Sequence, residues 1–92
     1  MTRYLTRVEL HNADGAAYTR LHAAMQSEGF SRTIFSGDGT EYKLPTAEYR
    51  MDTTLTRGEV HQLAKGAARS TNYTFCAITV DYNSATFNLD EV

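Results

Sequence analysis

The sequence predicts an α+β fold in which two helices cover one face of an antiparallel β-sheet. Two segments with apolar residues at helical spacing each follow a segment that alternates apolar and polar residues. A Gly-Asp-Gly turn at residues 37–39 joins two short runs that favour strands. The most β-prone segment of the chain, residues 73–82, comes after the second helix. The predicted order is therefore β-α-β-β-α-β.

The first strand and the first helix are predicted between residue 3 and Gly29. The run RYLTRVELHN alternates, as expected of a half-buried strand whose outer face is charged. Its inward residues are Tyr4, Val8 and Leu10. Asn12 or Asp14 can cap the helix that follows, and Gly29 supplies its left-handed stop. The residues at helical spacing are Tyr18, Leu21 and Met25.

The middle of the chain reads as a hairpin followed by a break. Residues 31–36 and 40–45 flank the glycine turn, whose glycines tolerate positive φ. Pro45 cannot donate to a strand ladder, so it marks a sheet edge or a gap between strands. Alternation resumes over residues 47–52, where Glu48, Arg50 and Asp52 point away from the core.

The last part of the chain supplies a second helix and one or two strands. Thr56 and Glu59 form a capping box at the start of the helix. Its apolar stripe consists of Val60, Leu63, Ala64 and Ala67. The strand over residues 73–82 places Cys76, Ile78 and Val80 on one side, and residues 85–89 add a short edge strand.

Right-handed closure of the two strand-helix-strand units puts both helices on one face of the sheet, which is the ferredoxin-like arrangement. A chain of 92 residues that is 41% apolar fits one such domain over residues 1–92. It buries only about 60–65% of its unfolded surface, so a homodimer interface would add stability.

Charge and cysteine content limit the function classes. The net charge is −2, which argues against strong nonspecific binding to nucleic acid or anionic lipid. All nine basic residues lie at or before Arg69, so a local basic patch is permitted. Cys76 is the only cysteine, which excludes an intrachain disulfide. We expect a soluble cytoplasmic protein without membrane contact, because no apolar run approaches about 20 residues.

The outward residues of the first and third core strands are the first candidate binding surface. They are Arg7, Glu9 and His11 beside Glu48, Arg50 and Asp52. In one interpretation Arg7 and Arg50 grip nucleic-acid phosphates and His11 carries a proton. In the other, favoured by the equal numbers of acids and bases, the charges pair across the strands as a solvated face.

The three histidines offer acid–base chemistry for RNA cleavage, in which one imidazole takes the 2′-hydroxyl proton and another protonates the leaving oxygen. Nothing in the spacing of His11, His22 and His61 brings them together, and the pairing of His22 with Arg20 also suits a solvated helix flank. A magnesium site is a weaker alternative. Its carboxylates would be Glu9, Asp14 and Asp81. We therefore expect neither a metal nor a cofactor.

Several segments together resemble the GhoS family of endoribonuclease antitoxins from type V toxin–antitoxin systems. They are YLTRVELHNADGAAYTRLHAAMQSEGFSRTI, DGTEYKLPTAEY and the capped helix with LAKGAA. The resemblance implies a ferredoxin-like fold similar to that of Cas2 proteins and cleavage of the messenger RNA for a small membrane-damaging toxin. Residues 10–12 lack the aspartate that closes the first strand in Cas2 proteins, so we expect this cleavage to be metal-independent. It also implies an RNA site at an R-x-R pair on the first helix. Arg20 and His22 occupy those positions here, and histidine can serve as an acid or a base.

Two function hypotheses follow. The first is a small RNA-binding protein, an endoribonuclease of the antitoxin type, with Arg20, His22 and His11 as catalytic residues and Arg7 and Arg50 as nucleic-acid contacts. The second is a non-enzymatic homodimer that binds another protein, as an accessory or inhibitor protein of a phage or mobile element. Six tyrosines and no tryptophan suit both.

Overall fold

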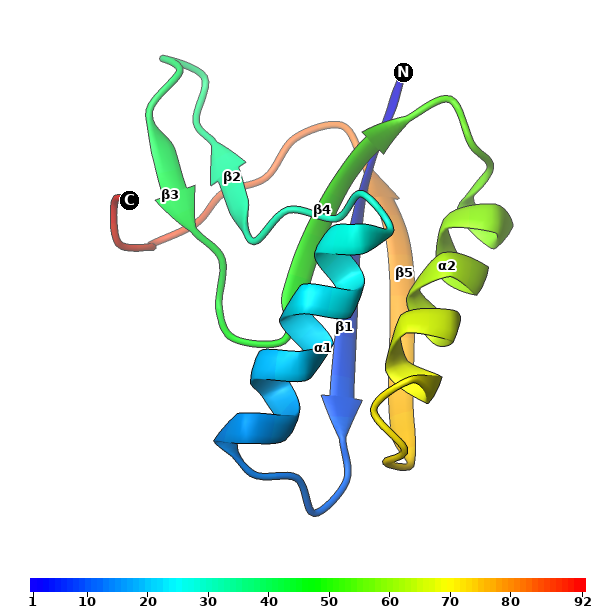
Figure 1. Ribbon diagram of the computed structural model, residues 1–92. Helices are drawn as coiled ribbons and strands as arrows, with labels where there is room; N and C mark the ends of the chain where they lie inside the picture. Colours follow the sequence, from blue (N-terminus) through cyan, green and yellow to red (C-terminus); the bar gives the residue numbers. More distant parts are fainter.

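A computed structural model describes residues 1–92 and confirms the predicted α+β order. Its elements are β1 (Thr2–Leu10), α1 (Gly15–Ser27), β2 (Thr33–Phe35), β3 (Glu41–Lys43), β4 (Glu48–Thr53), α2 (Arg57–Arg69) and β5 (Phe75–Tyr82). Both helices lie on one face of the sheet β4-β1-β5, and the β2-β3 hairpin lies beside it (Figure 1). We call the face without helices the open face. Neither helix is long and apolar enough to cross a membrane.

β1 is the central strand, and it pairs antiparallel with both β4 and β5. Tyr4, Val8 and Leu10 are buried on the helix side, whereas Arg7 is exposed on the open face. Arg7 lies opposite Glu48 of β4. The predicted alternation of β1 and its pairing with the third core strand are therefore confirmed.

The core fills the space between the helices and the sheet. Leu21 and Met25 of α1, Val60 of α2 and Val8 of β1 are fully buried within one cluster. Burying a side chain of this size stabilises the fold by about 1.5–3 kcal/mol. This cluster fixes α1 against β1 and β4, and so fixes the position of every polar group on that flank of the helix.

Both helices begin at the residues that the sequence indicates. Of the two residues predicted to cap α1, Asp14 is the N-cap, and its side chain accepts a hydrogen bond of 2.9 Å from the backbone N–H of Ala17. Thr56 and Glu59 form the predicted capping box of α2. The chain leaves α1 through Gly29, whose φ of +96° is costly for any other residue type.

The hairpin and the break after it also form as predicted. β2 and β3 pair antiparallel, and Gly39 in the turn has a φ of +86°. Pro45 lies between β3 and β4, where no ladder needs its missing N–H. The backbone of Ser31 exchanges two hydrogen bonds of 2.8 Å with Arg50, which attaches the base of the hairpin to β4.

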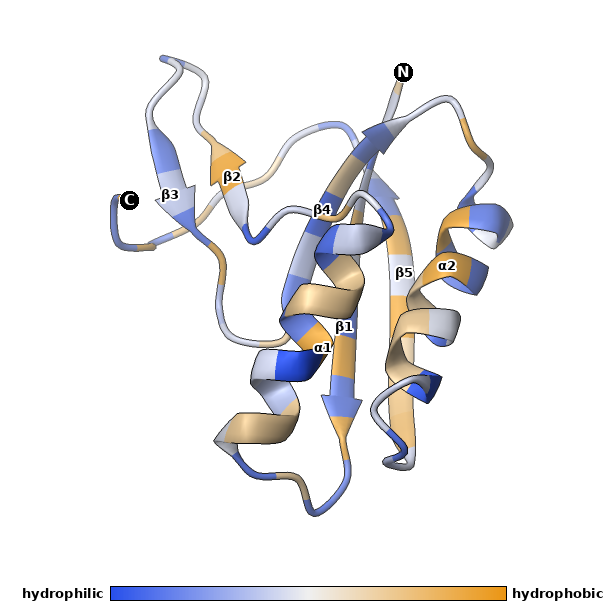
Figure 2. Ribbon diagram, viewed as in Figure 1, coloured by the Kyte–Doolittle hydropathy of each residue, from blue (hydrophilic) through white to orange (hydrophobic).

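β5 turns Cys76, Ile78 and Val80 to the open face. Its register with β1 decides this, because Ile78 lies opposite the outward-facing Arg7. Ile78 remains 60% exposed and Val80 44% exposed. The residues on the helix side are Phe75, Ala77 and Thr79. Figure 2 accordingly shows apolar residues along β5 as well as on the side of α2 that faces the sheet. β5 is also an edge strand.

Residues 85–89 do not form the predicted edge strand. We call residues 83–89 the tail. The tail must run from the end of β5, at one side of the sheet, to β3 at the other, so it has no strand edge to follow (Figure 1). Pairing begins only beyond it, where the Lys43 amide donates to the Asp90 carbonyl at 2.8 Å and the Val92 amide donates to Glu41 at 3.2 Å.

Candidate functional site

His22 of α1 and Tyr49 of β4 form a polar contact between a helix and the sheet. His22 Nδ1 lies 2.7 Å from the hydroxyl of Tyr49, a fully buried residue of β4. The two ring centroids are 5.7 Å apart, and the ring of Tyr18, one helical turn earlier, is 6.5 Å from that of His22. The Nε2 atom of His22 makes no hydrogen bond. Packing therefore fixes one side of the imidazole and leaves its second nitrogen available.

The surroundings of this pair shift both pKa values. Partial burial lowers the pKa of His22, and the nearby Arg32 guanidinium lowers it further, because each disfavours the imidazolium. Burial raises the pKa of Tyr49 to about 12, so the phenol stays protonated. His22 is consequently neutral at pH 7. In the tautomer whose proton lies on Nδ1, this nitrogen donates to the Tyr49 oxygen, and Nε2 carries a lone pair that can accept a proton.

Arg32 is the residue that the sequence reading missed here. It follows Gly29 and Phe30, where the chain turns back from α1 toward β4, and its charge acts on His22. It is exposed and forms no ion pair. Its neighbour Ser31 is paired with Arg50, so the backbone bridge places Arg32 next to β4. The sequence signal that could have identified Arg32 is the pair Gly29 and Phe30, because a left-handed glycine followed by a core residue indicates that the chain turns back toward the sheet just before Arg32.

Arg20 and His22 lie on opposite flanks of α1. Residues two apart on a helix are separated by about 200°, and the buried Leu21 stands between these two. His22 faces β4, whereas Arg20 is exposed and has no carboxylate within ion-pair distance. Arg20 is thus free to meet an anion on the surface of α1, but not on the flank where Tyr49 holds His22.

His11 lies on the other side of the sheet. It follows β1 on the open face, with Nδ1 3.2 Å from the Thr74 hydroxyl and Nε2 3.4 Å from Cys76 Sγ. His22 lies under α1 on the helix side. The structure therefore does not bring His11 and His22 to one reacting bond.

Arg50 and Arg7 differ although both point to the open face. Arg50 makes an ion pair of 2.8 Å with Asp52, and its Nε donates to the Thr33 carbonyl at 2.8 Å. Arg7 lies opposite Glu48 in register but forms no ion pair. The charge of Arg50 is neutralised, and its contacts tie β2 to β4. Arg7 keeps an unpaired charge.

The carboxylates considered for a metal are dispersed. Glu9 points to the open face at one end of β1, whereas Asp81 lies on the helix side at the opposite end of β5, 2.9 Å from Arg57. Asp14 is used as the cap of α1. No three side chains among His, Cys, Asp and Glu lie close enough to share a metal ion.

Comparison with protein-family models identifies a match. The family model described as Endoribonuclease GhoS matches residues 1–88. A search of the curated proteins finds no match. The matched range includes every element of the fold as well as His22, Tyr49 and Arg32.

Proposed function

Because this chain belongs to the GhoS endoribonuclease family, we propose that it cleaves RNA at a site made of His22, Tyr49 and Arg32, the His22 site. Family membership implies the endoribonuclease activity, and the contacts of His22 support this location. The observation that carries the proposal is an imidazole held through Nδ1 at 2.7 Å by a buried tyrosine, with an unpaired arginine beside it; burial and this arginine lower the pKa of the imidazole. These are the parts that general-base cleavage of a phosphodiester needs.

The proposed reaction uses the RNA 2′-hydroxyl as the nucleophile. His22 Nε2 takes the 2′-hydroxyl proton as the 2′-oxygen bonds to phosphorus and the bond to the 5′-oxygen breaks. Arg32 stabilises the negative charge that grows on the phosphoryl oxygens. The leaving 5′-oxygen takes its proton from solvent, since His11 lies on the other face of the sheet. The products carry a 2′,3′-cyclic phosphate and a 5′-hydroxyl, and no step needs a metal ion.

Other unpaired arginines extend the proposed contact with RNA. Arg20 on the outer flank of α1 and Arg7 on the open face have no ion pair. We assign both to phosphate contacts, which position the strand without reading its sequence. Arg50, already paired with Asp52, acts in this proposal by holding β2 against β4.

The test is cleavage of single-stranded RNA by His22→Asn, whose amide retains a hydrogen-bonding atom near the position of Nδ1 but cannot act as a base. We expect its rate to fall by at least about 100-fold, the usual contribution of a general base. His61→Asn is the matched control, because His61 is also bound through Nδ1, to Thr79 at 2.8 Å. Full activity of His22→Asn, or equal loss in both variants, would refute the assignment.

Arg32→Ala completes the test of the His22 site, and Arg20→Ala tests the proposed phosphate contact on the outer flank of α1. Both side chains are exposed, so the thermal midpoint should stay unchanged while cleavage falls. Arg69→Ala, which removes an exposed unpaired arginine from α2, is the control. Chelation with EDTA should leave the rate unaltered, and a chelator-sensitive rate would contradict the metal-independent reaction.

The proposed natural substrate is the messenger RNA for a small membrane-damaging toxin, as the resemblance implies. A short reading frame for an apolar peptide beside this gene would supply the transcript to test. Faster cleavage of that transcript than of a length-matched control RNA supports the antitoxin role. Equal rates on both would limit the proposal to a general ribonuclease.

A second candidate function is a homodimeric protein-interaction module. The observation that favours it is the open edge of β5 together with the exposed Ile78 and Val80. Light scattering of the wild-type chain and of Ile78→Lys tests it. A dimer that the substitution converts to a monomer, with no RNA shift at low salt, would favour this function over cleavage.

A further inference from the structure

We propose that the cleft between the tail and the open face, the tail cleft, binds the bases of single-stranded RNA that has passed the His22 site. The cleft has a volume of about 820 Å³, which lies in the range of small-ligand sites of about 300–1,000 Å³. It lies on the opposite face of the sheet from His22. The proposal rests on the RNA-cleaving function and adds where its substrate is held.

Two aromatic rings in the tail cleft are each stacked against an arginine. The Arg50 guanidinium lies 5.5 Å from the ring centroid of Phe35, and the Arg3 guanidinium lies 5.3 Å from that of Tyr82. Phe35 is 53% exposed, so part of its ring is accessible to a ligand. Aromatic surfaces beside guanidinium groups are the common platform for unpaired bases.

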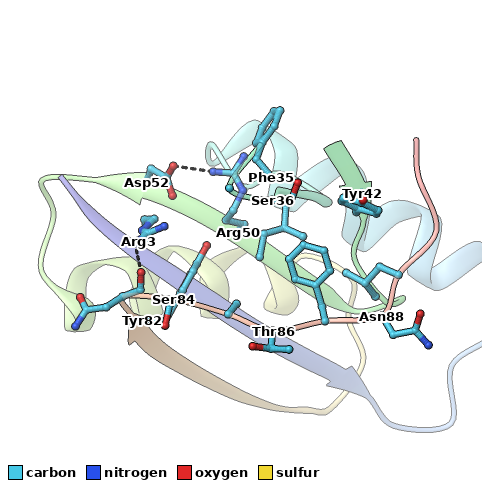
Figure 3. Close-up of a pocket in the computed structure, with 16 residues that line it drawn as sticks. Arg3, Phe35, Ser36, Tyr42, Arg50, Asp52, Tyr82, Ser84, Thr86 and Asn88 are labelled. Atoms are coloured by element: carbon cyan, nitrogen blue, oxygen red, sulfur yellow. Dashed lines mark hydrogen bonds and ion pairs between the residues drawn. The ribbon is translucent and has the colours of Figure 1, made fainter. Parts of the chain in front are cut away.

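The charge of the cleft favours an anionic strand. Arg50 is neutralised by Asp52, but Arg3 forms no ion pair and donates only to the Asn83 carbonyl (Figure 3). Arg3 belongs to the central strand β1, where it lies opposite Asp52 of β4 and Tyr82 of β5. A phosphate can therefore meet Arg3 while bases lie on the neighbouring rings.

The tail supplies unused hydrogen-bonding groups. Residues 84–89 make no hydrogen bond within the chain through either backbone or side chain. The ends are nevertheless fixed, at Asn83 by Arg3 and just beyond the tail at Asp90 by the Lys43 amide. Figure 3 shows the tail, with Ser84, Thr86 and Asn88, running across the open face. Such a strap presents amides, carbonyls and polar side chains in the manner that reads the edges of unstacked bases.

A second cleft shares residues with both the tail cleft and the His22 site. It has a volume of about 710 Å³, and its lining includes Arg32, Lys43, Asn88 and Leu89. Asn88 and Leu89 also line the tail cleft, and Arg32 belongs to the His22 site. Asp90 is the one side-chain carboxylate in this lining. Arg32 and Lys43, the two cations of this lining, have no ion pair, so they can meet the phosphates of a strand that lies along both clefts.

The test uses a labelled 2′-O-methyl RNA oligonucleotide, which lacks the nucleophile and so measures binding without cleavage. In fluorescence anisotropy at low salt we expect Phe35→Leu to weaken binding about tenfold, the usual size of one base–aromatic stack. Arg3→Gln should weaken binding and reduce the salt dependence by about one ion. Val80→Ala, on the open face outside the cleft lining, should bind like wild type.

Photo-crosslinking provides a measurement that needs no substitution. An oligonucleotide carrying 4-thiouridine should crosslink to peptides covering residues 33–43 or 82–89. Crosslinks confined to residues 15–32, or unaltered binding by both Phe35→Leu and Arg3→Gln, would overturn the proposal. Failure of the wild-type chain to bind the oligonucleotide also overturns it and points to a protein segment as occupant of the cleft.

The two proposals can fail separately. Suppose that cleavage of unmodified RNA depends on His22 but that binding is insensitive to the cleft variants. This result refutes RNA binding in the tail cleft and supports the His22 site. If binding depends on Phe35 and Arg3 but the protein cleaves no RNA, the proposed reaction is refuted and RNA binding in the tail cleft is supported.

Discussion

On the helix side of the sheet, fully buried residues such as Val8, Leu21 and Val60 pack in one cluster, and each polar group among them has a partner. On the open face, the charged residues of β1 and β4 lie beside the exposed apolar residues of β5, and only one ion pair forms. The same strands produce both faces because side chains alternate along them. Stability is thus concentrated on one side, and the other side presents unpaired groups such as Arg3 and Arg7 to a ligand. On the helix side the unpaired arginines, such as Arg20, are exposed, whereas packing holds His22.

The largest expected effect tests where stability lies. Leu21→Ala should lower the free energy of unfolding by about 2–5 kcal/mol, because the side chain is fully buried and its removal leaves a cavity. Ile78→Ala on the open face should change it by less than about 0.5 kcal/mol. Urea denaturation measures both. Similar losses in the two variants would mean that the open face is buried in solution, as in a dimer.

A smaller effect is expected from Tyr49→Phe. The substitution keeps the buried ring but removes the hydroxyl bound to His22, so it should cost about 0.5–1.5 kcal/mol of unfolding free energy. Tyr82→Phe is the matched control, because the Tyr82 hydroxyl makes no hydrogen bond within the chain. If both variants unfold like wild type, the hydrogen bond to His22 is not formed in solution.

On the open face, Asp52→Asn removes the charge that neutralises Arg50. We expect a loss of about 0.5–1 kcal/mol, which for a domain of this size lowers the thermal midpoint by a few degrees. Glu48→Gln should have less effect, since Glu48 faces Arg7 without forming an ion pair. Calorimetry measures both midpoints, and a larger drop for Glu48→Gln would reverse the roles of the two arginines.

The smallest effect concerns pH. Burial and Arg32 lower the pKa of His22 in the folded state, so the unfolded chain binds the proton more tightly. Stability should therefore fall as pH drops below the ordinary histidine value of 6.5, and this dependence should weaken in His22→Asn. Urea midpoints between pH 7 and pH 5 measure it. Stability that rises on acidification through this range would contradict the shift.

The elements of this fold could be read from the sequence because their signals are local. Alternation along β1, the caps at Asp14 and Thr56 and the break at Pro45 each involve residues within a few positions of one another. β5 carries apolar residues on both sides, such as Phe75 on one and Ile78 on the other, so the sequence pattern alone does not indicate which side faces the helices. Its register with β1 decided that.

The candidate site was less accessible from the sequence for the same reason. The imidazole of His22 depends on Tyr49 and Arg32, which lie 27 and 10 positions later and reach it only through the packing of α1 on β4. The tail cleft depends on a segment without any periodicity, whose course is set by its two fixed ends. Residue type identified His22 and Arg20, but tertiary contacts decided which neighbours each of them has.

The pairing of β1 with β5 has a consequence for how the chain reaches this structure. Arg3 lies opposite Tyr82, so the central strand finds one of its two partners only after the residues of β5 have been synthesised, about 80 positions later. Contacts between residues so distant in sequence slow folding, because a long loop must close before they form. The nascent chain therefore exposes one edge of β1 until β5 has emerged, and a truncation before residue 75 removes the strand that would cover it.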